Sequence, residues 1–186
     1  MQRCPWARSE LMIRYHDKEW GVPLHDDRAL FEFLVLEGMQ AGLSWETVLK
    51  KRENFRKAFA KFTTKKIASF TKSDVSALMK NEGIIRNRLK IESTINNASR
   101  FSEVKEEFGS FDDYIWNFVK GEPIVNKFKS LKEIPCNSLV SDEMSNDLKK
   151  RGFRFVGTTI CYAHMQATGM VNDHLTGCFR YKEVQK

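Results

Sequence analysis

Apolar side chains recur every three or four residues along most of the chain, a spacing that is typical of amphipathic α-helices. The clearest example starts at the aspartate pair 26–27, which can cap a helix whose apolar face carries Leu30, Phe33 and Leu34. The same periodicity places Glu37 on or beside that face. We therefore expect a helix here that holds a carboxylate close to the protein interior.

The periodicity predicts further helices, separated by glycine, proline and polar turns. The break MQAGLSW follows the first helix, and Ser44 can cap the next one. Ser73 or Asp74 can cap a later helix. We expect helices over residues 45–62, 65–70, 73–81, 86–108, 110–119, 141–151 and 158–169, and a loop over residues 122–135. Sustained alternation of polar and apolar residues is absent from the sequence, so the pattern predicts an all-α fold.

The length of 186 residues fits one domain, or two small lobes that share a core. The sequence contains no repeat, no low-complexity segment and no obvious linker. Its four cysteines are too few and too widely spaced for a disulfide scaffold. We expect a single unit that folds around its own hydrophobic core.

The charge balance is basic, because 31 Lys and Arg residues face 24 Asp and Glu residues, a net charge of +7. This balance favours an anionic partner, either nucleic acid or an acidic membrane surface, although many modestly basic proteins bind neither. The first 20 residues carry several charges and no continuous apolar run, unlike a signal peptide or a membrane span. We expect a soluble, cytoplasmic protein with no membrane partner.

Two pairs of metal-ligand residues lie at opposite ends of the sequence. His174 and Cys178 are four residues apart, which on a helical turn would place both side chains on one face. Cys4 and His16 form a second pair. Together they would make a closed Cys2His2 zinc site, which has no open position for catalysis and would join the two termini. The spacing alone fits two core cysteines and two unrelated histidines equally well.

Aromatic residues concentrate in the first quarter of the chain. Trp6, Tyr15, Trp20 and Trp45 could surround Glu37, and such a pocket suits a flat, cationic or electron-poor ligand. The carboxylate could also accept hydrogen bonds from an amino group. The other interpretation is that these tryptophans are ordinary core residues and that the glutamate is solvated.

A glycine-bounded turn, RGFRFVG, joins two of the expected helices between Gly152 and Gly157. Its backbone amides lead into the N-terminus of a helix that starts near Thr158, an arrangement that can bind phosphate. The turn is flanked by the basic residues Lys149, Lys150, Arg151 and Arg154. A second basic segment, GIIRNRLK at residues 83–90, is either a second contact to a phosphate backbone or a solvated surface.

In combination these segments resemble the bacterial 3-methyladenine DNA glycosylase I enzymes, a branch of the helix-hairpin-helix glycosylases. The resemblance covers essentially the whole chain. It is carried by RCPWA, YHDKEWGVP, FEFLVLEGMQAGLSWETVLKKRENFRKAF, GIIRNRLKI and KKRGFRFVGTTICYAHMQATGMVNDH followed by GC. Several consecutive blocks in the same order make a chance match negligible.

The resemblance implies one glycosylase unit over residues 1–186, built of two helical lobes, with a helix-hairpin-helix element at residues 149–172. It implies a monomer that acts on double-stranded DNA containing 3-methyladenine and releases the free base. The implied zinc ligands are Cys4, His16, His174 and Cys178, and the implied base pocket is Trp6, Tyr15, Trp20, Glu37 and Trp45. The implied DNA contacts are Gly42, Leu43, Arg151, Gly152, Arg154, Gly157 and Thr158.

Within this pocket the resemblance assigns hydrogen bonding to Glu37 and Tyr15, stacking to Trp45, and the catalytic role to Glu37. Met12 departs from the pattern, because relatives often have a tyrosine three residues before the pocket tyrosine, and one wall is expected to be softer. Thr159 stands where related enzymes that also cut the backbone have a lysine. Without this amine we expect a monofunctional enzyme that leaves an abasic site.

Asp173 is the nearest match to the aspartate that the wider superfamily places after the second helix, and we expect it to be structural or a partner of a zinc ligand. Two other functions fit the same motifs. A non-catalytic, zinc-stabilised DNA-binding protein would share the charge, the turn and the metal site. A glycosylase for another base, such as 3-methylguanine or an oxidised base, would differ only in the shape of the pocket.

Overall fold

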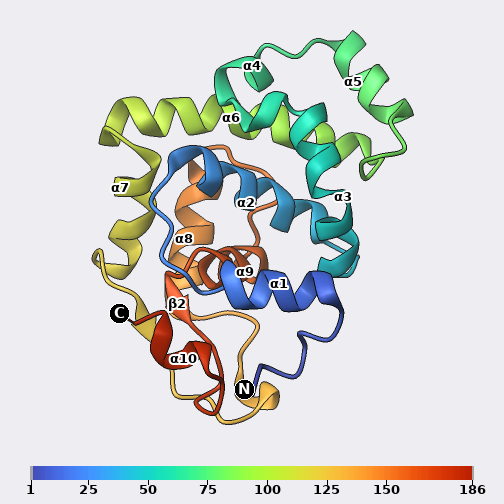
Figure 1. Cartoon of the computed structure of the whole chain (residues 1–186). Coiled ribbons are helices and arrows are strands. Elements are labelled where there is room, and N and C mark those ends of the chain that lie inside the picture. Colours follow the sequence, from blue (N-terminus) through green and yellow to red (C-terminus); the bar gives the residue numbers. More distant parts are fainter. Residues whose placement is uncertain (1, 186) are drawn as a thin grey trace.

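The computed structural model describes residues 2–185 and is mostly helical (Figure 1). The α-helices are α1 (Glu10–Lys18), α2 (Asp27–Gln40), α3 (Trp45–Ala58), α4 (Thr64–Ala68), α5 (Lys72–Lys80), α6 (Arg88–Phe108), α7 (Phe111–Trp116), α8 (Leu139–Lys150), α9 (Thr158–Ala167) and α10 (Arg180–Glu183). Short 3-10 helices cover Ala60–Phe62, Asn117–Val119 and Leu131–Glu133. Two strands, β1 (Ile124–Val125) and β2 (Val171–Asn172), complete the described secondary structure.

Helix α2 lies at the centre of the molecule, with α6 and α7 on one side and α9 on the other (Figure 1). Every residue from Leu30 to Met39 is buried, so this helix is covered around its whole circumference rather than along one stripe. The main core cluster contains apolar residues from every α-helix between α2 and α9. The central position of α2 fixes Glu37 in the interior, as its periodicity predicted.

One charged residue of α2 is buried together with the apolar ones. The carboxylate of Glu32 accepts hydrogen bonds from the guanidinium groups of Arg52 (2.5 Å) and Arg56 (3.0 Å) on α3. Arg52 also binds Glu19 just after α1 at 2.5 Å. Because Glu32 has two charged donors, its burial leaves no unpaired charge, and the network ties α1, α2 and α3 together.

Several helix caps are the ones expected from the sequence. Asp26 accepts a hydrogen bond from the amide of Ala29, and Ser44 accepts one from the amide of Thr47. The expected cap of α5 is wrong, because Thr71 is the N-cap. Asp74 instead forms the reciprocal half of a capping box by accepting from the Thr71 amide.

Other local predictions also needed correction. The helix expected over residues 45–62 ends at Ala58, and residues 60–62 adopt positive φ angles in a tight turn. Helix α1, which was not anticipated, starts at Ser9, whose hydroxyl accepts from the amide of Met12. The loop expected over residues 122–135 contains β1, which pairs in parallel with β2. These strands are only two residues long, too short for an alternation pattern to reveal them.

The segment that follows α1 lies directly against the end of α9. The amide of Gly21 donates to the carbonyl of Gln166 (3.0 Å), and the amide of Leu24 donates to that of Thr168 (3.1 Å). Gly169 has a φ of +74°, and a Cβ there would lie 2.4 Å from the backbone of Val22. Only glycine permits this approach, which brings the N-terminal aromatic residues to α9.

Among residues 2–185, no helix is both long and apolar enough to cross a membrane.

Candidate active site

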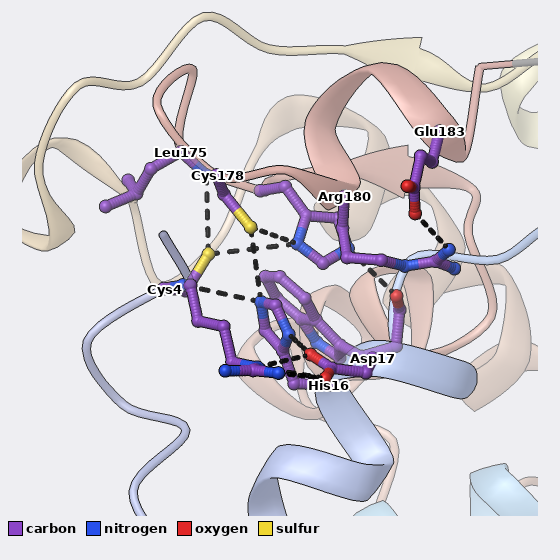
Figure 2. A network of polar contacts seen from close by, with 10 residues as sticks. Cys4, His16, Asp17, Leu175, Cys178, Arg180 and Glu183 are labelled. Atoms are coloured by element: carbon purple, nitrogen blue, oxygen red, sulfur yellow. Dashed lines mark hydrogen bonds and ion pairs between the residues drawn. The ribbon is translucent and has the colours of Figure 1, made fainter. Parts of the chain in front are cut away.

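Cys4, His16, His174 and Cys178 converge in the interior between the two ends of the chain (Figure 2). All four are buried, and their ligand atoms lie within 4.8 Å of one another. The Cys178 sulfur is 3.5 Å from His16 Nε2 and 3.7 Å from His174 Nδ1. The Cys4 sulfur is 3.8 Å from the same His174 nitrogen. This group could hold a metal ion.

The sulfur-to-nitrogen distances in this cluster fit a metal ion with tetrahedral coordination. Bonds of about 2.3 Å to sulfur and about 2.0 Å to nitrogen at a tetrahedral angle place those two atoms about 3.5 Å apart. The sulfur-to-nitrogen distances between 3.5 and 3.8 Å agree with this value. The cluster has two sulfur and two nitrogen donors from the protein, so a bound ion would have no open coordination position.

The outer nitrogen of each imidazole is held by an acceptor. His16 Nδ1 is 2.7 Å from the Asp17 carboxylate, which is itself bound by Arg3 at 2.9 Å. His174 Nε2 is 3.0 Å from the backbone carbonyl of Trp20. These contacts favour tautomers in which His16 Nε2 and His174 Nδ1 are unprotonated and face the sulfurs, as metal ligation requires.

The geometry that brings His174 and Cys178 together differs from the sequence prediction. Residues 173–179 form a turn rather than a helix, closed by a hydrogen bond from the Cys178 amide to the Leu175 carbonyl at 2.7 Å. The Leu175 amide also donates to the Cys4 sulfur at 3.5 Å. The expected helical turn is therefore wrong, although the expected juxtaposition of the four residues is confirmed.

A cavity of about 400 Å³ opens beside this cluster. Its volume is in the range of small-molecule sites. Glu37 is the only charged side chain among the described residues that line it. The lining residues are Trp6, Met12, Tyr15, Trp20, Glu37, Gln40, Trp45, Leu131, Ile134, Pro135, Ala163 and Gln166. The cavity thus combines aromatic and apolar walls with one carboxylate.

The aromatic wall is built directly on the Cys/His cluster. The Trp20 ring contacts the His174 ring edge-on, with centroids 4.6 Å apart, and stacks with His16 at 6.2 Å. Trp6 packs edge-on against Trp20 at 5.0 Å. A change in the cluster would therefore shift the tryptophans that shape the cavity.

The carboxyl group of Glu37 lies in a site that disfavours its charge. The residue is 4 % exposed, and burial raises its pKa to about 8. Tyr15 lies close by, and burial together with the charge of Glu37 raises the tyrosine pKa well above its usual value. In the ligand-free protein Glu37 is therefore mostly protonated at neutral pH, and a cationic ligand would favour its ionised form.

A smaller recess of about 250 Å³ adjoins the cavity and shares Glu37, Gln40 and Ala163 with it. Its other walls are the exposed loop at residues 41–43 and the first turn of α9, including Thr159. The connection between α8 and α9, residues 151–157, thus leads into the helix turn that lines this recess. This arrangement brings the glycine-bounded turn, the loop and the cavity to one region of the molecule.

Nearly the whole chain is similar to known proteins. A family profile described as methyladenine glycosylase matches residues 6–181. The chain is 50% identical over 182 residues to the DNA-3-methyladenine glycosylase 1 of Escherichia coli strain K12, covering 97% of each chain. It is also 50% identical over 177 residues to the DNA-3-methyladenine glycosylase of Haemophilus influenzae, covering 95% of this chain and 96% of that one. The chain belongs to the methyladenine glycosylase family.

Solved structures of the family superpose closely on this one. One described as 3-methyladenine DNA glycosylase I matches with a TM-score of 0.94 and 53% identity, covering 96% of this chain and 98% of that chain. The enzyme from Staphylococcus aureus, solved for the structural basis of 3-methyladenine recognition, matches with a TM-score of 0.93 and 34% identity, covering 96% of each chain. A structure described as a tyrosine-to-phenylalanine variant of 3-methyladenine DNA glycosylase I in complex with 3-methyladenine matches with a TM-score of 0.93 and 33% identity. This match covers 96% of this chain and 97% of that chain.

In this glycosylase, the structure brings all five aromatic and acidic residues of the expected pocket to the cavity, together with Met12. Sequence reasoning missed the rest of the lining, which comes from the end of α2, from the expected loop and from α9. The missed residues are Gln40, Leu131, Ile134, Pro135, Ala163 and Gln166. The apolar residues Leu131, Ile134 and Pro135 within a polar loop were the only available signal.

The two arginines that the resemblance assigns to DNA binding differ in their surroundings. Arg151 forms ion pairs with Glu107 and Asp147, both at 2.7 Å, and its guanidinium lies over the Phe108 ring. Its charge is therefore engaged within the protein. Arg154, in contrast, is exposed, and its backbone N–H and C=O both bind the Asn97 side chain at 2.8 Å.

The basic segment GIIRNRLK contributes to internal structure through Lys90. The Lys90 ammonium group is buried and donates to the carbonyls of Met39 (2.8 Å) and Ala41 (2.6 Å) at the C-terminal end of α2. It therefore supports the loop that carries Gly42 and Leu43. Its burial also lowers its pKa, so it is not a free surface cation.

The pKa of Glu37 leads to a prediction about the pH dependence of stability. Its folded-state pKa of about 8 lies above its ordinary value of 4.5, so the neutral carboxyl group contributes stability that is complete below pH 4.5 and is lost as pH rises through 8. Glu37→Gln does not titrate. Relative to this variant, we expect the parent to lose about 1.4 kcal/mol of unfolding free energy per pH unit between those values.

Urea unfolding at a series of pH values measures this difference. Glu106→Gln, at an exposed glutamate, is the control and should follow the parent at every pH. Equal pH dependence in Glu37→Gln and the parent would show that Glu37 is ionised in the folded protein.

Proposed function

We propose that this glycosylase excises 3-methyladenine from double-stranded DNA by hydrolysing the bond between base and sugar, leaving an abasic site. The observation that carries the proposal is the aromatic cavity in which Glu37 is the one acidic or basic side chain among the described lining residues. A flipped base requires such stacking surfaces together with a group that reads its edge. The relatives named for this activity match this chain over nearly its full length.

Methylation at N3 gives adenine a positive charge, so the bond to the sugar is already weak and the base leaves as a neutral molecule. The protein then needs to extract the base, exclude water from it and stabilise the positive charge that develops on the sugar. The rings of Trp6, Tyr15, Trp20 and Trp45 supply π faces that attract a cation. Ordinary adenine has no such charge and gains less from these faces.

Glu37 supplies the second part of this discrimination. A cationic base beside the carboxyl group lowers its pKa from about 8, so binding releases a proton and creates an ion pair in a partly desolvated site. A methyl group in an apolar pocket supplies only about 1 to 3 kcal/mol of discrimination. The added charge interaction, about 2 kcal/mol, separates the damaged base from the large excess of normal adenine.

The proposal includes hydrolysis without strand cleavage. Among the described residues that line the cavity there is no lysine, and Thr159 lies at the adjoining recess. A Schiff base with the sugar requires an amine at this position. The cavity also argues against a purely structural DNA-binding protein, which would have no use for it.

The Cys/His cluster is proposed to bind a structural zinc ion. Two thiolates and two imidazoles are the donors that zinc prefers, and Cys4, His16, His174 and Cys178 would fill all four positions. The ion would stabilise the joined termini and supply no reacting group. The residues that act on the substrate belong to the neighbouring cavity.

Residues 149–172 are proposed to form a helix-hairpin-helix element that binds the DNA backbone, in a glycosylase unit of two helical lobes that acts as a monomer. Gly157 is the N-cap of α9, and a Cβ there would meet no atom within 4 Å. A phosphate could therefore approach the free amides of α9, assisted by Gly152, Arg154 and Thr158. The exposed side chain of Leu43, with Gly42, is placed to fill the gap left by the flipped base.

We expect the protein to release free 3-methyladenine from alkylated duplex DNA and to leave intact strands with abasic sites. Chromatography of the released bases and gel analysis of the strands measure both products. We expect Glu37→Gln to excise the base about thirtyfold more slowly, because the charge interaction of about 2 kcal/mol is lost. In the parent kcat/KM should rise with pH up to about 8, as Glu37 ionises, and in the variant this rise should disappear. Release of no base would refute the proposed activity.

Cys178→Ser should remove one zinc ligand and lower the unfolding free energy by about 3 kcal/mol or more. Metal analysis and thermal melting measure the two effects. Cys136→Ser is the matched control, because Cys136 is exposed and lies outside the cluster. A variant that bound no zinc and still melted at the temperature of the parent would contradict the structural role.

Gly157→Val should weaken binding to any DNA duplex while leaving the binding of free 3-methyladenine unchanged, because the added side chain covers the α9 amides and not the cavity. Fluorescence anisotropy with undamaged duplex and quenching of tryptophan by the free base measure the two affinities. We expect about a tenfold loss for duplex. An equal loss of both affinities would argue against separate backbone and base sites.

A further inference from the structure

Asp173 is buried behind the cavity wall and holds the side-chain amide of Gln166, a polar group of that wall. The residue is 1 % exposed, and its carboxylate accepts three hydrogen bonds from side chains. Oδ1 accepts from Asn126 at 2.7 Å, and Oδ2 accepts from Tyr162 at 2.7 Å and from the amide of Gln166 at 2.8 Å. Gln166 is the one of these three donors that lines the cavity.

This network fixes the orientation of the Gln166 amide. The Asp173 oxygens only accept hydrogen bonds here, so the NH2 group of Gln166, and not its oxygen, must face them. Within residues 2–185 no donor contacts Gln166 Oε1, and this atom is not among the buried atoms that lack a partner. The oxygen is therefore left accessible at the cavity as an acceptor with a fixed direction.

An adenine ligand needs more than one acceptor. Its exocyclic amino group has two N–H donors, and a buried donor without a partner weakens binding. Glu37 can accept one of them. Among residues 2–185, the other polar side chains that line the cavity are Tyr15, Gln40, the tryptophan N–H groups and Gln166. Of these, Gln166 is the one whose acceptor is fixed by a buried carboxylate.

We propose that Gln166 is a specificity-determining residue, whose Oε1 accepts a hydrogen bond from the exocyclic amino group of the damaged base, and that Asp173 is the positioning residue that holds this amide. A base with an oxygen at that position, as in guanine or hypoxanthine, would bring two acceptors together and be rejected. This inference rests on the proposed function, since it concerns the same cavity. It assigns the selection of adenine over 6-oxopurines to a residue outside the aromatic wall.

The test compares two free bases that differ at this position. 3-Methylhypoxanthine carries an oxygen where 3-methyladenine carries the amino group. Their dissociation constants can be measured by quenching of the pocket tryptophans in the parent protein, in Gln166→Met and in Tyr162→Phe. Tyr162→Phe is the matched control, because it removes the other donor to the same Asp173 oxygen without changing the cavity lining.

We expect the parent to prefer 3-methyladenine and Gln166→Met to reduce that preference about tenfold, the effect of one lost hydrogen bond and one lost repulsion. Tyr162→Phe should keep the preference within about twofold of the parent, as expected when only a supporting hydrogen bond is lost. Gln166→Ala gives the same readout if the methionine variant does not fold. An unchanged preference in the Gln166 variants, an equal fall in Tyr162→Phe, or no preference in the parent would overturn the inference.

Base release from alkylated duplex by the same proteins separates this inference from the proposed activity. A parent that selects 3-methyladenine in binding but releases none from DNA would refute the excision activity and leave the role of Gln166 standing. A parent that releases 3-methyladenine while Gln166→Met keeps the full preference would refute only the role of Gln166.

Discussion

The convergence of Cys4 and His16 with His174 and Cys178 is the constraint on which the active site depends. It joins residues near the two ends of the chain, and Trp20 packs directly on its histidines. The cavity wall is therefore an extension of the cluster. The cluster and the ion pair between Arg3 and Asp17 both attach the N-terminal segment to the body of the protein, and Trp6 packs against Trp20 from that segment. Its contribution to activity is indirect, because it holds aromatic side chains at the positions from which they can stack on a base.

The cavity places a carboxyl group where the free protein cannot easily charge it. Burial of Glu37 without an ion partner costs stability, in contrast to Glu32 on the same helix, whose charge is paired with two arginines. The presence or absence of charged partners thus distinguishes Glu32, which has a structural role, from Glu37, whose carboxyl group is free to bind a ligand. In the proposed function, a cationic base would supply the missing partner, and the unfavourable environment of Glu37 in the free protein would then contribute selectivity in the complex.

Helix α6 contacts both parts of the surface that are proposed to bind DNA. Near its N-terminus Lys90 binds the carbonyls at the end of α2, just before Gly42 and Leu43. Two turns later Asn97 binds both backbone groups of Arg154 in the connection between α8 and α9. A single rigid helix thus spaces the loop and the turn, although its own side chains are largely buried at these contacts.

The sequence by itself determined the features that depend on neighbouring residues. Apolar periodicity predicted α2, α6 and α9, the caps Asp26 and Ser44 marked helix starts, and the family resemblance predicted the four cluster residues and the aromatic wall. Local spacing did not reveal α1 or the turn that carries Cys178. It also did not predict that Arg151 would be paired internally. Only the tertiary structure placed Leu131, Ile134 and Gln166 at the cavity and Asp173 behind it. These contacts join segments that are far apart in the chain, and their formation depends on how whole helices pack rather than on any short-range pattern.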